Sequence, residues 1–160
     1  MSRQKKRRIS LALRNLWNAG TRIRSAELFL AKNDWGDAIR ESREALDFVT
    51  QALLFSAGIE WNRFQKPGPL LLASKEKISL PPFGNWSRIE QILGEAAPSL
   101  DEAASFGGSD FMTFGDPFEM PATSPPTEEK ALASLEGARY LCSLCQEIVS
   151  LSLKGTKKHS

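Results

Sequence analysis

Two cysteines three residues apart, Cys142 and Cys145, give this 160-residue chain a C-x-x-C motif. A structural zinc site needs four ligands, and the sequence has no second cysteine pair and a single histidine, His159, beside the last residue. We therefore expect no metal site, and nothing in the sequence points to another cofactor. A redox role stays open, but two cysteines at this spacing on an apolar helix are most often small buried hydrophobes.

Basic residues gather at the start of the chain, where residues 1–24 contain no acid. Such cations can bind nucleic-acid phosphates with a salt-dependent affinity. Aromatic side chains that would stack on bases are not interleaved with them, so the alternative is a solvated, frayed terminus. The candidate nucleic-acid-binding residues are Arg3, Lys5, Lys6, Arg7 and Arg8.

Arg40 and Arg43 form a second candidate site, on the outer side of a helix predicted over residues 34–58. They could face a phosphate or a partner, but acids three and four residues away predict ordinary surface ion pairs. The four tryptophans stand near predicted helix ends or loops, and we expect them to cap the core rather than form a ligand cage: Trp17, Trp35, Trp61 and Trp86.

The helix over residues 34–58 organises the other elements. Small or apolar residues recur along it every seventh position, which predicts a face that lets other helices come close: Ala38, Ala45, Ala52 and Ile59. Asp34 can cap its first turn, and Gly58 can adopt the left-handed conformation that ends it.

Similar patterns predict helices over residues 9–32, 70–77, 85–106 and 127–154, with a possible break at Gly20 and a bend at Pro98. The short link at residues 33–34 makes the first two helices an antiparallel hairpin. No stretch alternates with the period of a strand. The fold class is therefore all-α, an up-and-down bundle of four to five helices.

The chain is long enough for one domain, which we place at residues 9–154, with a basic arm at 1–8 and a flexible tail at 155–160. No apolar run is long enough to span a membrane and no leader with a cleavage site is evident. A reducing cytoplasm fits the two unpaired cysteines. Residues 107–126 are rich in Gly and Pro yet contain Phe111, Phe114 and Phe118, which we expect to form an interface between two copies of the chain.

The order of these parts resembles the HEPN family, named for nucleotide binding in higher eukaryotes and prokaryotes. The likeness rests on short segments spread over residues 21–153: Ala45, Ala52-Leu53-Leu54, Gly58-Ile59-Glu60, Phe114-Gly115-Asp116, Thr127-Glu128-Glu129 and Leu135-Glu136-Gly137-Ala138-Arg139. The resemblance implies a helical bundle that pairs as a homodimer. Many members are RNA-cleaving toxins of toxin–antitoxin pairs or partners of small nucleotidyltransferases.

Ribonuclease members of that family use an Arg followed four to six residues later by a His, and this chain lacks the pair. We therefore expect no ribonuclease activity and assign no catalytic residue. Relatives also place Glu and Lys four residues apart on the central helix, where this chain has Asp47 and Gln51. With Arg40 and Arg43, these two complete the candidate nucleotide-binding or partner-binding residues.

The sequence thus predicts a non-catalytic helical domain that acts by homodimerisation and protein association, with a nucleotidyltransferase-type partner or a bound nucleotide. The alternative is a nucleic-acid-binding or RNA-cleaving protein that uses the basic N-terminal residues. Loss of binding with salt, and on deletion of residues 1–8, would favour the alternative.

Overall fold

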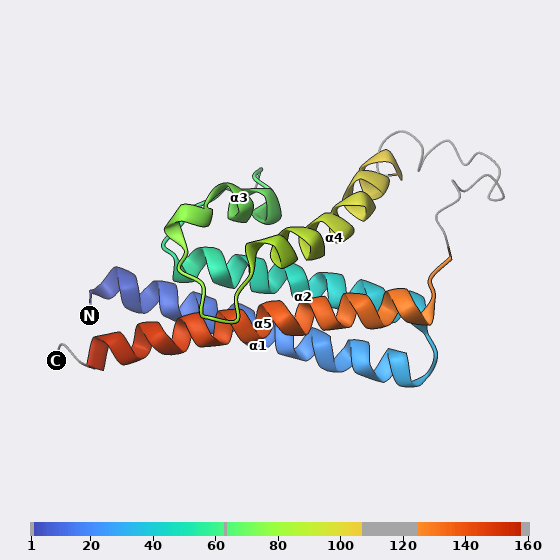
Figure 1. The fold of residues 1–160 in the computed structure, drawn as a ribbon, viewed down its shortest axis with the longest axis horizontal. Helices are drawn as coiled ribbons and strands as arrows, with labels where there is room; N and C mark the ends of the chain where they lie inside the picture. The colour runs from blue at the N-terminus through green and yellow to red at the C-terminus, as the bar shows by residue number, and fades with distance from the viewer. Residues whose placement is uncertain (1, 63, 107–124, 158–160) are drawn as a thin grey trace.

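The computed structural model describes residues 2–62, 64–106 and 125–157, with the side chains of 97–106 and 156–157 left aside. In this part of the chain the structure is all-α, as predicted (Figure 1). Its elements are α1 (Arg3–Ala31), α2 (Trp35–Ser56), α3 (Pro67–Ala73), the short 3-10 helix η1 (Lys75–Lys77), α4 (Trp86–Phe106) and α5 (Glu128–Lys157).

Three long helices, α1, α2 and α5, run side by side, with α1 antiparallel to α2 (Figure 1). The chain turns between α1 and α2 at Asn33, whose φ of 60° is left-handed. α3 packs on α2, and α4 contacts α5. The start of α1 and the end of α5 therefore lie at the same end of the bundle, next to the segment that follows α2 (Figure 1).

Small residues line the contacts between the long helices. Ala38, Ala45 and Ala52 of α2 are fully buried, as the seven-residue repeat predicted. On α5, Ala138 and Cys145 have no exposed surface either. Short side chains allow helix axes to approach closely, which explains how α2 packs against both α1 and α5.

The predicted starts of α2, α4 and α5 and the predicted end of α2 are confirmed by their capping residues. The Asp34 carboxylate accepts a hydrogen bond from the Asp37 N–H at 3.2 Å. The Thr127 hydroxyl accepts one from the Lys130 N–H at 3.2 Å, and Asn85 Oδ1 accepts one from the Ser87 N–H at 2.9 Å. Gly58 ends α2 with a φ of 72°. Each side chain satisfies an amide that the helix leaves unpaired.

The first and last helices are longer than the sequence predicted. α1 begins at Arg3, capped by Ser2, so the residues assigned to a basic arm form its first turns. It passes Gly20 without a break, because the helix is held by packing against α2 as well as by local preference. α4 continues through Pro98 as one helix, and α5 extends to Lys157, into the residues assigned to the tail.

Two apolar side chains of α1 also differ from their predicted places. Leu13 belongs to the apolar pattern that predicts this helix, which placed it on the buried stripe, but it is 46% exposed. Trp17 was expected to cap the core, yet it lies in the middle of α1 and is 69% exposed. Trp61 and Trp86, in contrast, pack against the core. The periodicity of α1 identified a helix, but it did not separate the buried side from its exposed edge.

Candidate functional site

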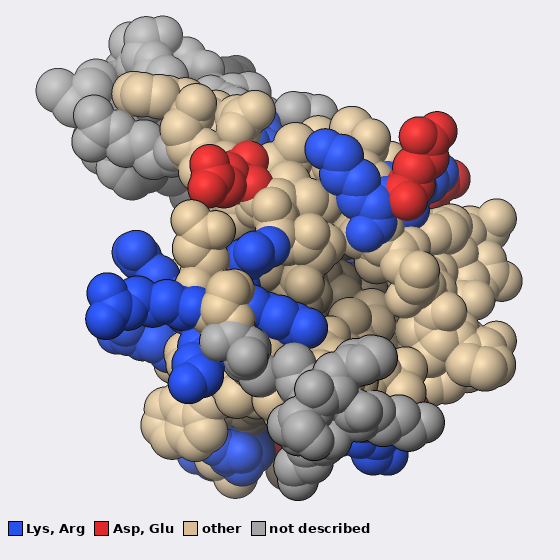
Figure 2. All heavy atoms as spheres, turned by 90° about the vertical axis from the view of Figure 1, so that its left-hand side faces the viewer, with Lys and Arg blue, Asp and Glu red and all other residues tan. Residues whose placement is uncertain are grey.

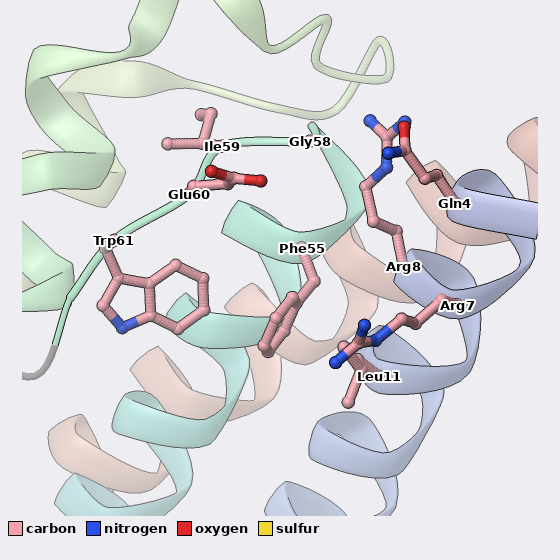
Figure 3. A pocket seen from close by; sticks show the side chains of 9 residues that line it. All are labelled: Gln4, Arg7, Arg8, Leu11, Phe55, Gly58, Ile59, Glu60 and Trp61. Carbon is pink, nitrogen blue, oxygen red and sulfur yellow. The ribbon is translucent and has the colours of Figure 1, made fainter.

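A pocket opens at the end of the bundle where α1 begins and α2 ends. Its volume is about 540 Å³. α1 contributes Gln4, Arg7, Arg8 and Leu11, and the end of α2 with the following segment contributes Phe55, Gly58, Ile59, Glu60 and Trp61 (Figure 3). Lysines and arginines gather on this end of the molecule, next to a hollow (Figure 2). Two segments far apart in sequence therefore build one concave surface.

Arg7 and Arg8 are the charged groups on the α1 wall of this pocket. Neither guanidinium forms an ion pair with a carboxylate in the described part of the chain. Both extend toward the end of α2, Arg8 beside Gly58 and Arg7 on the Phe55 side (Figure 3). Their N–H donors are thus available to an anion that enters the pocket.

Gly58 makes the position of Arg8 possible. A side chain at residue 58 would overlap the Arg8 guanidinium, and the φ of 72° also favours glycine there. The Arg8 guanidinium thereby lies beside the C-terminal end of α2, which is the negative end of the helix dipole. Glycine at residue 58 thus leaves the space that this arginine occupies.

Phe55 and Trp61 form the aromatic wall. Their ring centroids are 4.6 Å apart with 56° between the ring planes. Both side chains are partly exposed, and both line the pocket. Aromatic faces of this kind stack on flat heterocycles. Glu60 is the one carboxylate of the lining, so two guanidinium groups leave the pocket with a net positive charge.

The candidate nucleic-acid-binding residues divide between this pocket and the open surface. Arg7 and Arg8 line the pocket. Arg3, Lys5 and Lys6 are exposed on the first turns of α1 and do not line it. The structure therefore brings two of the five predicted cations together with aromatic side chains, which the sequence did not place next to them.

The candidate residues on α2 lie elsewhere. Arg40 Nη1 is 2.6 Å from Asp37 Oδ1, and Arg40 Nη2 is 3.7 Å from Glu41 Oε1. Arg43 lines a crevice of only about 30 Å³ between α2, α4 and α5. Arg40 thus forms the ion pairs expected of a surface residue, and the crevice beside Arg43 is too small for a nucleotide. Asp47 is exposed and Gln51 half-buried.

The pKa of Asp47 is raised, first because the neighbouring side chains partly desolvate its carboxyl group although the residue is exposed, and then by the negative charge of Glu44. A side-chain hydrogen bond with Asp34 is the largest cause that raises the pKa of Asp37, and Arg40 opposes it. Both acids lie outside the pocket. Neither shift therefore bears on the charge of the candidate site.

Cys142 and Cys145 are buried in the core, as expected for small hydrophobes. Burial raises the pKa of Cys142 to about 11, and burial with the neighbouring Cys142 raises that of Cys145 further. Thiols in this state are poor nucleophiles because the thiolate is the reactive form. Among the described residues, no group of three potential metal ligands comes together and no buried side-chain nitrogen or oxygen lacks a partner.

The predicted interface residues Phe111, Phe114 and Phe118 lie outside the described residues, as does His159. The sequence also missed part of the pocket. Gly58 was predicted only as the end of a helix, and Phe55 was not among the candidate site residues. Phe55 and Trp61, six residues apart with Gly58 between them, were the signal that the sequence offered. Only the fold shows that the basic first turns of α1 lie beside these aromatic side chains.

Comparison with protein-family models, curated proteins and solved structures finds no match to this chain. In the described residues, no helix combines the length and apolar character needed to cross a membrane.

Proposed function

We propose that this protein is a non-catalytic helical domain that binds a nucleotide, free or at the end of a single-stranded RNA, in the pocket between α1 and α2. The observation that carries the proposal is the pairing of two arginines that lack carboxylate partners among the described residues with the Phe55 and Trp61 rings. The arginines of α1 can bind a phosphate, and the two aromatic rings can stack on a base.

Each part of such a ligand has a counterpart in the pocket. The Arg7 and Arg8 guanidinium groups can donate parallel hydrogen bonds to phosphate oxygens. The base stacks on the aromatic wall, with Trp61 as its main contact. The volume of about 540 Å³ falls within the range of roughly 300–1,000 Å³ typical of small-molecule pockets. Glu60 faces the same space and can accept a hydrogen bond from a sugar hydroxyl or a base amine.

The likeness to the HEPN family, which remains a prediction of the sequence, points to the same class of ligand. Homodimerisation and association with a nucleotidyltransferase-type protein also remain predictions. A bound nucleotide is compatible with both, because the pocket uses the end of the bundle and leaves most of α4 and α5 free for a partner.

The test is a calorimetric titration of the purified protein with adenosine 5′-monophosphate at low salt. In the double variant Arg7→Gln/Arg8→Gln we expect binding to weaken by about a hundredfold, because hydrogen bonds to charged groups contribute about 1.5–3 kcal/mol each. Trp61→Leu should weaken it about tenfold through the loss of stacking, for which about 1–3 kcal/mol per base is typical.

Arg14→Gln is the control matched to the single variant Arg8→Gln, since each removes one positive charge from α1 and Arg14 lies outside the pocket. It should leave the affinity unchanged. Equal loss in Arg14→Gln and Arg8→Gln would show that only the general positive charge attracts the ligand. Equal affinities for inorganic phosphate and for the nucleotide would show that the aromatic wall takes no part. Either result would overturn the proposal.

A further inference from the structure

A second surface of α1 faces away from the pocket. Residues at steps of three and four along the helix share one side of it: Lys6, Ser10, Leu13, Trp17, Thr21, Arg24 and Leu28. Leu13, Trp17 and Leu28 are 46%, 69% and 64% exposed. The second half of α1 runs along the lower edge of the bundle in Figure 1. We call this stripe, together with the adjacent Arg14, the outer face of α1.

The charges of this outer face are all positive. Lys6, Arg14 and Arg24 are exposed, and none forms an ion pair with a carboxylate in the residues that the structure describes. Arg24 donates a hydrogen bond to the Thr21 hydroxyl at 3.2 Å, which holds its guanidinium on the same face. The outer face therefore combines large apolar side chains with cations and has no acid.

We propose that the outer face of α1 is the docking surface for an acidic amphipathic helix of a partner protein. Leu13, Trp17 and Leu28 would contact the apolar stripe of that helix, and Lys6, Arg14 and Arg24 would pair with carboxylates on its flanks. Exposed aromatic and arginine side chains are the residues that contribute most at protein interfaces. This surface shares no residue with the nucleotide pocket and does not depend on it.

The spacing of the apolar contacts fits a helical partner. Leu13 and Leu28 are fifteen residues apart, which corresponds to about 22 Å along a helix axis. An antiparallel or parallel helix of about four turns covers that length. Its apolar side chains at every third or fourth position would meet the stripe on α1, as in other helix-to-helix recognition.

Charge argues against a second copy of the chain as the occupant. A symmetric pair places the same surface on both subunits, so the cations of one outer face would oppose those of the other. Like charges brought together across an interface weaken binding. The homodimer predicted from the sequence would therefore use another surface.

The pattern also differs from that of a membrane-binding or RNA-binding helix. Arg24 lies between Trp17 and Leu28 on the same stripe, so inserting both apolar side chains into a bilayer would carry its guanidinium with them. Strand-binding surfaces stack bases on several aromatic rings, whereas this face has one aromatic side chain and two leucines that a nucleic acid would not use. A partner helix with leucines and carboxylates offers apolar contacts to Leu13, Trp17 and Leu28 and ion pairs to Lys6, Arg14 and Arg24.

The experiment uses the full chain and two synthetic helical peptides, one with leucine at every third or fourth position flanked by glutamate, the other with lysine in place of each glutamate. The glutamate peptide should bind at least about tenfold more tightly than the lysine peptide, which corresponds to about 1.4 kcal/mol. Trp17→Ser/Leu28→Ser and Arg14→Glu/Arg24→Glu should each weaken its binding by a similar factor.

Phe83→Ser and Lys77→Glu are the matched controls. Phe83 is 50% exposed and Lys77 is exposed, and both lie between α3 and α4 in the sequence, outside the outer face of α1. Phe83→Ser and Lys77→Glu should both bind the glutamate peptide as tightly as the unchanged protein does. Circular dichroism should be the same for all variants, because each changed side chain is largely exposed.

Three outcomes would overturn the proposal. The two peptides could bind equally, which would exclude charge complementarity. The protein could fail to bind the glutamate peptide but bind vesicles of anionic phospholipid, or single-stranded RNA, with a binding that Trp17→Ser/Leu28→Ser abolishes. Sedimentation could show a dimer that Trp17→Ser/Leu28→Ser dissociates. A failed nucleotide titration would leave this test unaffected, since the outer-face variants change no residue that lines the pocket.

Discussion

α1 contains two groups of cations, of which one forms ion pairs with α2 and the other lines a pocket. On the side that faces α2, Arg22 Nη1 lies 3.1 Å from Glu41 Oε2 and 3.0 Å from Glu44 Oε2. At the start of the helix, Arg7 and Arg8 face a pocket instead, without a carboxylate partner in the described residues. The difference follows from what lies opposite, since α2 presents acids beside Arg22 and aromatic rings beside Arg7.

This comparison separates charges that stabilise the bundle from charges that are available to a ligand. Glu41 is 6% exposed, so its carboxylate depends on the Arg22 guanidinium for compensation. A partly exposed guanidinium such as Arg7 or Arg8 needs no such partner, because water solvates it. Substitutions in the two groups should therefore change different properties of the protein.

The largest effect on stability is expected for Arg22→Ala. The free energy of unfolding should fall by about 2 kcal/mol, because the buried Glu41 keeps only Arg40 at 3.7 Å, while partial solvation of Arg22 limits the loss. Urea denaturation monitored by circular dichroism measures the change. Arg14→Ala is the control and should stay within about 0.5 kcal/mol of the unchanged protein. Equal losses in both variants would show that the loss does not come from the carboxylates paired with Arg22.

A second prediction concerns how two copies meet. Phe114→Ala/Phe118→Ala should weaken self-association more than it lowers the melting temperature, because the sequence predicts that these side chains form an interface between two copies. Light scattering at several protein concentrations measures the association. If the protein is monomeric before and after the change, yet the variant is much less stable, these side chains belong to the core of one subunit.

The smallest effect is expected at Asp47, an acid of α2 that forms no ion pair with a cation in the described residues. Its raised pKa means that the folded state binds the proton more tightly than the unfolded state. Ionised Asp47 therefore lowers stability at neutral pH, and this loss disappears as the pH falls below the ordinary value of 3.8. Asp47→Asn should raise the melting temperature slightly at pH 7 and leave it unchanged near pH 3. An increase at both values would point to a cause other than ionisation.

The fold was largely predictable from the sequence because its signals are local. Seven-residue spacing of small residues identified α2, and Asp34 and Thr127 marked helix starts that the hydrogen bonds confirm. The length of α1 was not predictable in the same way. Ser2 caps it and packing against α2 carries it through Gly20, and both depend on tertiary context.

The candidate site was less predictable than the fold. The sequence singled out Arg7 and Arg8 for their charge, but Trp61 lies more than fifty residues later and had no visible link to them. Only the packing of α1 against the end of α2 brings the two together. Exposure was also poorly predicted. Leu13 follows the spacing of buried residues and Trp17 was expected to cap the core, but both lie at the surface.

The most direct test of the central claim is the salt dependence of binding to a short single-stranded RNA. If Arg7 and Arg8 contact phosphates, Arg7→Gln/Arg8→Gln should reduce the slope of log affinity against log salt by about 1.4, since each contact contributes about 0.7 on a single strand. Arg22→Gln, which removes a cation paired with Glu41 and Glu44, should leave that slope unchanged. We therefore expect a lower slope for Arg7→Gln/Arg8→Gln and an unchanged slope for Arg22→Gln. Equal slopes for the unchanged protein and the Arg7→Gln/Arg8→Gln variant would contradict it.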